Sequence, residues 1–185
     1  MSSSAVSFPP VASPNALVLV LGSMPGERSL EASQYYAHPR NAFWPIMEAL
    51  YGIDVKAPYT RRLEELVRHR VALWDVLRSC ERQGSLDARI RSPVPNDFDA
   101  FLTGHPQIRS VFCNGRAACY LFTSLVAPRL SPSARDLTVE VLPSTSPANA
   151  RFSLAEKIEA WRAVGVCSSA NSTRRSNQRS SSRGA

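Results

Sequence analysis

The stretch NALVLVLGSMPG, residues 15–26, decides the fold class of this chain. Ala16 to Leu21 form a continuous apolar run rich in Val and Leu, which is typical of a strand buried on both faces of a parallel sheet. Gly22 ends the run, and the Pro25-Gly26 pair predicts a loop directly after it. We therefore expect a parallel sheet with a loop leaving the end of this strand.

The rest of the chain alternates between strand and helix patterns. Further strands are predicted in VALWDVL (71–77), IRSVFCNG (108–115) and DLTVEVLPSTSPAN (136–149). Helices are predicted in NAFWPIMEALYG (41–52), TRRLEELVRHR (60–70), NDFDAFLTGHP (96–106), RAACYLFTSLV (116–126) and SLAEKIEAWRAVG (153–165), with a short helical turn in GSLDARI (84–90). This alternation predicts an α/β fold, with an open, mostly parallel, four-stranded central sheet flanked by helices on both faces.

Composition divides the chain into a core and two tails. Residues 1–15 are rich in Ser and Pro, and residues 166–185 are rich in Ser and Arg. We predict a disordered N-terminal segment at 1–15, one domain at 16–165 and a disordered tail at 166–185. No apolar run approaches a membrane span, and the N-terminus lacks the pattern of a signal peptide, so we expect a cytoplasmic protein with no membrane partner.

The charge is unevenly distributed. The formal net charge is +7, and residues 166–185 contribute +4 from four arginines without an acid, which leaves +3 for the rest. A basic tail can bind phosphates, although it can equally be a solvated end, so charge makes nucleic acid a candidate partner and no more. The four cysteines and three histidines do not have zinc spacing, and we expect free thiols, no metal and no cofactor.

The loops that follow the strands carry the polar and aromatic residues. They start at Gly22, Asp75, Asn114 and Pro143, and ligands of open α/β sheets bind outside the carboxyl ends of the strands. We therefore expect GSMPG…HPRNAFW and LPSTSPAN to face each other across one cleft. In the string HPRNAFW, Phe43 could stack on a flat ligand while Asn41 contacts its polar edge, as in the recognition of flipped nucleobases.

Each motif alone also has a purely structural explanation. GSMPG can be a tight turn, and it matches neither G-x-G-x-x-G nor a loop that ends in G-K-[ST]. Trp44 can be a core residue, Asp75 can cap a strand end or pair with an arginine, and LPSTSPAN can be an ordinary rigid loop. It is the combination of motifs that indicates a function.

Together, GSMPG, YYAHPRNAFWPIM, LWDVL, GSLDARI, FCNG and LPSTSPAN resemble the uracil-DNA glycosylase superfamily. The chain is most similar to the hypoxanthine-DNA (DNA-deoxyinosine) glycosylase branch, family 6, over roughly Leu17 to Gly165. The resemblance implies a monofunctional glycosylase of base excision repair that hydrolyses the N-glycosidic bond of deaminated bases in double-stranded DNA. Hypoxanthine is the expected first choice, the product is an abasic site, and we expect a monomer.

The resemblance also implies roles for individual residues. Asn41 matches the essential asparagine, Phe43 the aromatic that stacks on the extruded base, and Ser144 to Ala148 the loop that presses into the duplex. Other branches carry an acid or Asn where this chain has Ser23 and Met24, which favours hypoxanthine over uracil. The base-binding candidates are Gly22, Ser23, Met24, Phe43 and Asp75, and the DNA-binding candidates are His38, Arg40, Asn114, Ser144, Thr145 and Ser146.

The scarcity of lysine bears on the type of glycosylase. Only Lys56 and Lys157 occur, and neither lies in a cleft motif. Glycosylases that also cut the backbone use an amine nucleophile, so the sequence predicts base removal alone. Three alternatives stay open: a mismatch-type uracil-DNA glycosylase, a non-catalytic protein that binds single strands or damaged DNA, and a nucleoside hydrolase acting on small molecules.

Overall fold

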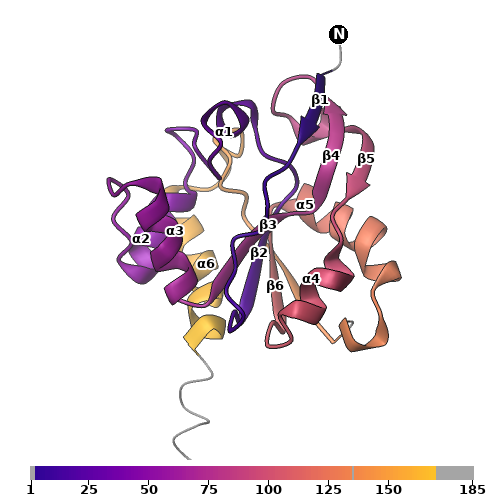
Figure 1. Cartoon of the computed structure of the whole chain (residues 1–185). Coiled ribbons are helices and arrows are strands. Elements are labelled where there is room, and N and C mark those ends of the chain that lie inside the picture. Colours follow the sequence, from indigo (N-terminus) through magenta and orange to yellow (C-terminus); the bar gives the residue numbers. More distant parts are fainter. Residues whose placement is uncertain (1–2, 135, 170–185) are drawn as a thin grey trace, which may run out of the picture.

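A parallel sheet of four strands forms the centre of the molecule (Figure 1). The computed structural model describes residues 3–134 and 136–169. The strands are β2 (Val18–Gly22), β3 (Val71–Asp75), β6 (Ser110–Asn114) and β7 (Thr138–Leu142), in the order β3-β2-β6-β7. All three neighbouring pairs are parallel, which confirms the predicted sheet.

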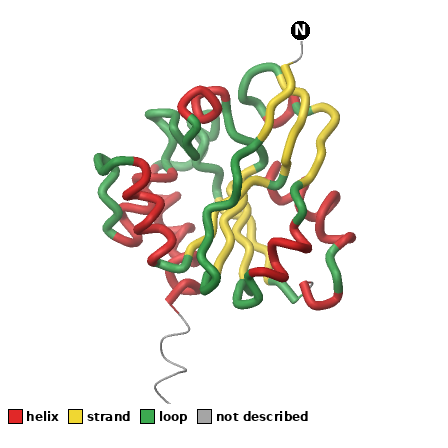
Figure 2. Tube along the Cα trace, in the orientation of Figure 1, coloured by secondary structure: helices red, strands yellow, loops and turns green. Residues whose placement is uncertain are grey.

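Helices cover both faces of this sheet, as predicted (Figure 2). One face packs against α2 (Phe43–Tyr51), α3 (Tyr59–Arg68) and α6 (Leu154–Ser169), and the other against α4 (Phe98–Gly104) and α5 (Arg116–Leu121) with its π-helical continuation at Phe122–Val126. Strand β2 explains the need for two layers. Val18 and Val20 belong to the hydrophobic core under α2, α3 and α6, while Leu19 and Leu21 belong to the core on the opposite face of the sheet. The strand is therefore buried on both sides.

A second, smaller sheet was not predicted. It consists of β1 (Ser3–Val6), β4 (Leu77–Arg82) and β5 (Arg91–Pro95), which pair antiparallel in the order β1-β4-β5. The short 3₁₀ helix Asp87–Arg89 lies between β4 and β5, as the helical turn expected in GSLDARI. Helix α1 (Glu27–Ala32) lies at the same end of the molecule as this sheet (Figure 1).

The predicted tail boundaries are wrong at both ends. Residues 3–6 form β1 against β4, and Val11 forms a bridge with Leu73, so the N-terminal segment is part of the fold because it completes the free edge of β4. Helix α6 continues to Ser169, beyond the predicted end at residue 165, and the remaining predicted tail, 170–185, lies outside the described residues. No helix in the described part of the chain has the length and apolar character needed to cross a membrane.

Candidate active site

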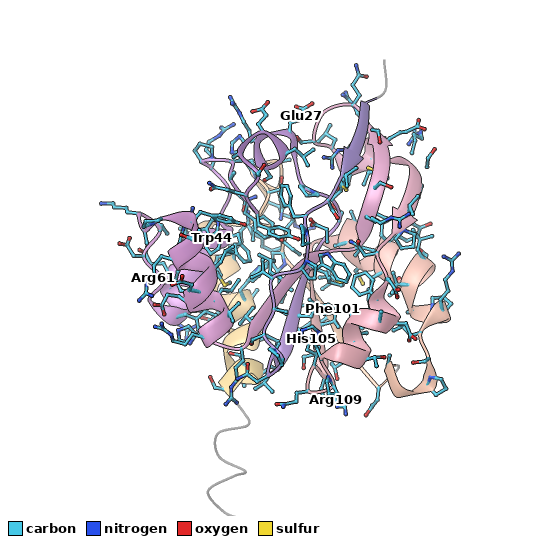
Figure 3. All side chains as sticks on the ribbon, viewed as in Figure 1. Glu27, Trp44, Arg61, Phe101, His105 and Arg109 are labelled. Carbon is cyan, nitrogen blue, oxygen red and sulfur yellow. The ribbon has the colours of Figure 1, made fainter. Side chains whose placement is uncertain are left out.

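A cavity of about 150 Å³ opens at the carboxyl ends of the parallel strands. Its lining comes from the loops after β2, β3, β6 and β7, as the sequence predicted, and from the hairpin between β4 and β5. Figure 3 shows Glu27, at the start of α1, at this end of the molecule and Arg109, just before β6, at the opposite end. The cavity is small beside the roughly 300–1,000 Å³ of pockets for drug-sized ligands, so it suits one compact planar group.

The floor of the cavity is formed by Gly22, Asp75 and Tyr36. Asp75 ends β3 and is only 3% exposed. A Cβ atom on Gly22 would collide with Asp75 Oδ1 and would lie 3.3 Å from the Tyr36 hydroxyl. Glycine is therefore required at the end of β2 so that the Asp75 carboxyl group can pack directly on the backbone.

The electrostatics of the floor favour neutral groups. Burial raises the pKa of Asp75 to about 8, Arg82 opposes this shift, and the charge of Asp87 adds to it. Burial also raises the pKa of Tyr36, and the charge of Asp75 raises it further. Among the described residues, neither Asp75 Oδ2 nor the Tyr36 hydroxyl has a partner with hydrogen-bond geometry, although Asn114 lies close enough to the Tyr36 hydroxyl to lower its pKa in part. Because unpaired buried polar atoms are costly, these two atoms mark the place where a polar ligand would bind.

The aromatic ring available to a ligand belongs to Tyr36, not to Phe43. Phe43 is fully buried and does not line the cavity, so the prediction that it stacks on the base is wrong. As the first residue of α2, it packs edge-on against Trp161 of α6. The Tyr36 ring lies on top of it, with centroids 4.1 Å apart and planes 24° apart, and Tyr36 lines the cavity.

Asn41 lines the cavity with its amide group partly fixed. Its Oδ1 atom accepts a hydrogen bond of 2.9 Å from the Phe43 backbone N–H, which holds the turn before α2. The carbonyl oxygen is thus engaged by the backbone, and the N–H₂ group is the part of the side chain available to a ligand. Asn41 therefore offers donors, which suit an oxygen, a ring nitrogen or a water molecule.

The loop after β7 forms the opposite wall, and Asn114 holds it in place. Thr145 N–H donates to Asn114 Oδ1 at 2.8 Å, while Asn114 Nδ2 donates to Thr145 Oγ1 at 2.9 Å. Thr145 also lines the cavity, but it is 1% exposed and its hydroxyl braces the loop, so its contact with DNA stays a prediction. Ser144 and Ser146 line the cavity and remain candidates for contacts with DNA.

The loop after β2 is held by the β4–β5 hairpin. Ser23 Oγ donates to Asp87 Oδ1 at 2.5 Å, Arg82 donates to the Pro25 carbonyl, and Ser85 Oγ accepts from the backbone of the loop. Asp87 is a cavity residue that sequence reasoning missed, although the GSLDARI motif contains it. Burial raises the pKa of Asp87, while the hydrogen bond from Ser23 and the charge of Arg82 lower it.

The remaining predicted residues lie around these walls. Met24 lines the cavity but is 6% exposed and belongs to the core, so it contributes shape. His38 also lines the cavity, and its Nδ1 accepts a hydrogen bond from the Arg40 backbone N–H at 3.1 Å. Arg40 does not reach the cavity and lies exposed in a neighbouring groove. No group of three His, Cys, Asp or Glu that could hold a metal occurs among the described residues.

The family model of the uracil DNA glycosylase superfamily matches residues 9–165. The chain belongs to this superfamily. Superfamily relatives include a protein named hypoxanthine DNA glycosylase from Methanosarcina acetivorans, which is 36% identical over 160 residues, covering 85% of this chain and 95% of the relative. A protein of the same name from Methanosarcina barkeri is 38% identical over 110 residues, covering 59% of this chain and 70% of the relative.

A solved structure supports the superfamily fold. The solution NMR structure of a candidate uracil DNA glycosylase from Methanosarcina acetivorans matches with a TM-score of 0.75 and 34% sequence identity. The match covers 88% of this chain and 97% of that protein. The match to the superfamily model begins at residue 9, before the predicted start of the domain at residue 16, and β1 lies outside it.

Proposed function

We propose that this member of the superfamily removes hypoxanthine from double-stranded DNA by hydrolysing the N-glycosidic bond of deoxyinosine, leaving an abasic site. The observation that carries the proposal is the cavity floor, where Asp75 Oδ2 and the Tyr36 hydroxyl lack partners with hydrogen-bond geometry beside an aromatic face. The names of the two Methanosarcina relatives agree with this substrate. As a DNA glycosylase, the protein acts on deaminated bases in repair.

The floor matches the edge of a deaminated base. Hypoxanthine presents the O6 acceptor beside the N1–H donor, and a neutral carboxyl group presents one donor and one acceptor at similar spacing. An ionised Asp75 would instead repel O6. The neutral form, which burial favours up to about pH 8, is therefore the form suited to recognition. A base extruded from the duplex would place one face on Tyr36.

The same groups would stabilise the leaving base. Breaking the bond between C1′ and the base nitrogen leaves the electron pair on the base and an oxocarbenium-like sugar, as in glycoside hydrolysis. The Asp75 and Tyr36 hydroxyl groups and the Asn41 N–H₂ group can donate to the developing anion. All three are fixed by the fold before the substrate arrives, so little reorganisation is needed during the reaction.

Two carboxyl groups in different environments suggest that each has a different role in the reaction. Asp75 lies at the buried floor with its Oδ2 unpaired, whereas Asp87 lies on the β4–β5 hairpin, where its Oδ1 accepts a hydrogen bond from Ser23. We assign Asp87 as the group that accepts the proton of the attacking water when its oxygen bonds to C1′. Asn41 would orient this water or bind the base through its N–H₂ group.

The proposed enzyme removes the base without an amine nucleophile. Lys157 is buried, and its Nζ atom donates to the Asn149 carbonyl at 3.0 Å, away from the residues that line the cavity. We further propose that the enzyme acts as a monomer. We place it in the cytoplasm, in keeping with the free thiols of Cys80, Cys113, Cys119 and Cys167.

The test is the release of free base from duplexes that carry a single deoxyinosine or a single deoxyuridine, with the base identified by chromatography. The proposal expects hypoxanthine release, and it expects Asp87→Asn to slow the single-turnover rate by roughly 100-fold or more, which is typical of losing a general base. Uracil presents the same pattern of acceptor and N–H donor as hypoxanthine, so the cavity floor could bind either base. Release of uracil alone would therefore indicate a mismatch-type uracil-DNA glycosylase. Binding of the duplex without release of either base would reject catalysis.

A further inference from the structure

A second groove runs beside the cavity. It has a volume of about 560 Å³ and lies between the turn after β6 and the loop after β7. Arg116 and Arg151 line it, together with Ser144, Asn149 and Phe152, and no acidic side chain does so. Since Ser144 lines both hollows, the groove begins where the cavity ends.

Neither arginine of this groove forms an ion pair with a described residue. Both are exposed. Within residues 3–134 and 136–169, the ion pairs of arginine engage Arg28, Arg61, Arg68 and Arg162, and none involves Arg116 or Arg151. The Arg151 guanidinium lies 5.5 Å from the centre of the Phe152 ring, which restricts where the cation can move.

The groove and the cavity are held at a fixed separation. Gly115 has φ +97°, and a Cβ atom there would lie 2.9 Å from Ser144 Cβ, so the turn that precedes Arg116 packs tightly on the loop after β7. Asn149 Nδ2 donates to the Ser144 carbonyl at 3.1 Å, and Lys157 holds the Asn149 carbonyl in turn. A ligand that fills the cavity therefore meets the two arginines at a defined place.

We propose that this groove binds the phosphodiester backbone of the damaged strand directly beside the extruded nucleotide, through Arg116 and Arg151. The inference rests on the proposed function, because that function supplies the strand. The arginine fork matches the geometry of phosphate oxygens and can bind them with two hydrogen bonds. The neighbouring groove that contains Arg28 and Arg40 is less suited to an anion, because the acidic Glu31 also lines it and pairs with Arg28 at 3.3 Å.

The salt dependence of DNA binding tests this assignment. The full chain would be titrated with a duplex carrying a non-hydrolysable abasic-site analogue, between 50 mM and 1 M salt. Each lost phosphate contact should reduce the slope of log K against log salt by about 0.9. Arg116→Ser combined with Arg151→Ser should therefore reduce the slope by about 1.8, which corresponds to roughly 60-fold weaker binding at 0.1 M salt if binding at 1 M is unchanged.

Two control variants separate the groove from general effects of charge. Arg109→Ser removes an exposed arginine at the opposite end of the molecule and should retain the wild-type slope (Figure 3). Replacing both groove arginines with lysine keeps the charges and should retain most of the slope, and it provides the comparison if the serine variant does not fold. A serine variant with the wild-type slope would overturn the proposal, as would an equal loss in Arg109→Ser. If the wild type released no base, the proposed activity would be rejected, but the measured salt dependence of DNA binding would still decide whether the groove binds phosphates.

Discussion

Replacing Asp75 with asparagine tests whether the floor of the cavity is held neutral. Burial raises the pKa of Asp75 from 3.8 to about 8 in the folded protein, whereas the unfolded chain keeps the ordinary value. Between about pH 4 and pH 8 the folded state thus binds a proton that the unfolded state releases, and the free energy of unfolding falls as the pH rises. At about 1.36 kcal/mol per pH unit, the wild type should lose roughly 4 kcal/mol from this group between pH 5 and pH 8.

Urea unfolding at pH 5, 6, 7 and 8 measures this loss. An asparagine side chain cannot ionise, so Asp75→Asn should not lose stability from this source, and its curve should separate from that of the wild type by roughly 4 kcal/mol over this range. Asp54→Asn, at an exposed turn, is the matched control and should follow the wild-type profile. Unfolding curves of wild type and Asp75→Asn that stay parallel from pH 5 to pH 8 would refute the reasoning, because Asp75 would then not titrate in this window.

The same substitution should change the pH dependence of catalysis. Ionisation of Asp75 places a negative charge beside the O6 atom and the leaving base, so base release by the wild type should decline above about pH 8. Asp75→Asn keeps a donor and an acceptor, and its single-turnover rate should stay level across that range. A wild-type rate that increases through pH 8 would show that the ionised form is the active one.

Three further substitutions address the floor and the walls. Gly22→Ala places a methyl group against Asp75 Oδ1, and thermal or urea unfolding should show a loss of about 1–3 kcal/mol, as for other overpacked sites. Tyr36→Ala removes the ring on which a base would stack, worth about 1–3 kcal/mol in binding, so titration with an abasic-site duplex carrying free hypoxanthine should show weaker capture of the base. Tyr36→Phe keeps the ring but loses the hydroxyl, and it should weaken capture by less than Tyr36→Ala does. Lys157→Met releases the Asn149 carbonyl and should slow base release without abolishing it, and borohydride should trap no covalent complex with DNA in either protein.

The four strands of the central sheet and the cavity were predictable from sequence because both follow from local patterns. The apolar run at 16–21 has no polar face, and such a run fits only a strand covered on both sides, as β2 is. Parallel strands bring their carboxyl ends to one edge, so the polar loops that begin at Gly22, Asp75, Asn114 and Pro143 had to meet.

Other features depend on tertiary contacts that no local pattern records. Tyr36 and Phe43 belong to the same aromatic string, and the packing of α2 on α6 decides which ring faces the cavity. Asp87 is 64 residues from Ser23, and it reaches the site because the β4–β5 hairpin folds back over the loop after β2. Strand β1 consists of SSAV, which has no distinct strand signal and is ordered by pairing with β4.

The most direct test of the central claim is the release of hypoxanthine from duplex DNA that carries a single deoxyinosine, by wild type, Asn41→Ala and the control Asn15→Ala. Asn15 is an exposed asparagine outside the cavity, so its variant controls for loss of an amide elsewhere. Wild type and Asn15→Ala should release hypoxanthine at equal single-turnover rates, and Asn41→Ala should lose at least roughly 100-fold, as expected for one preorganised donor. Equal rates in all three proteins, or no release by the wild type, would contradict the account.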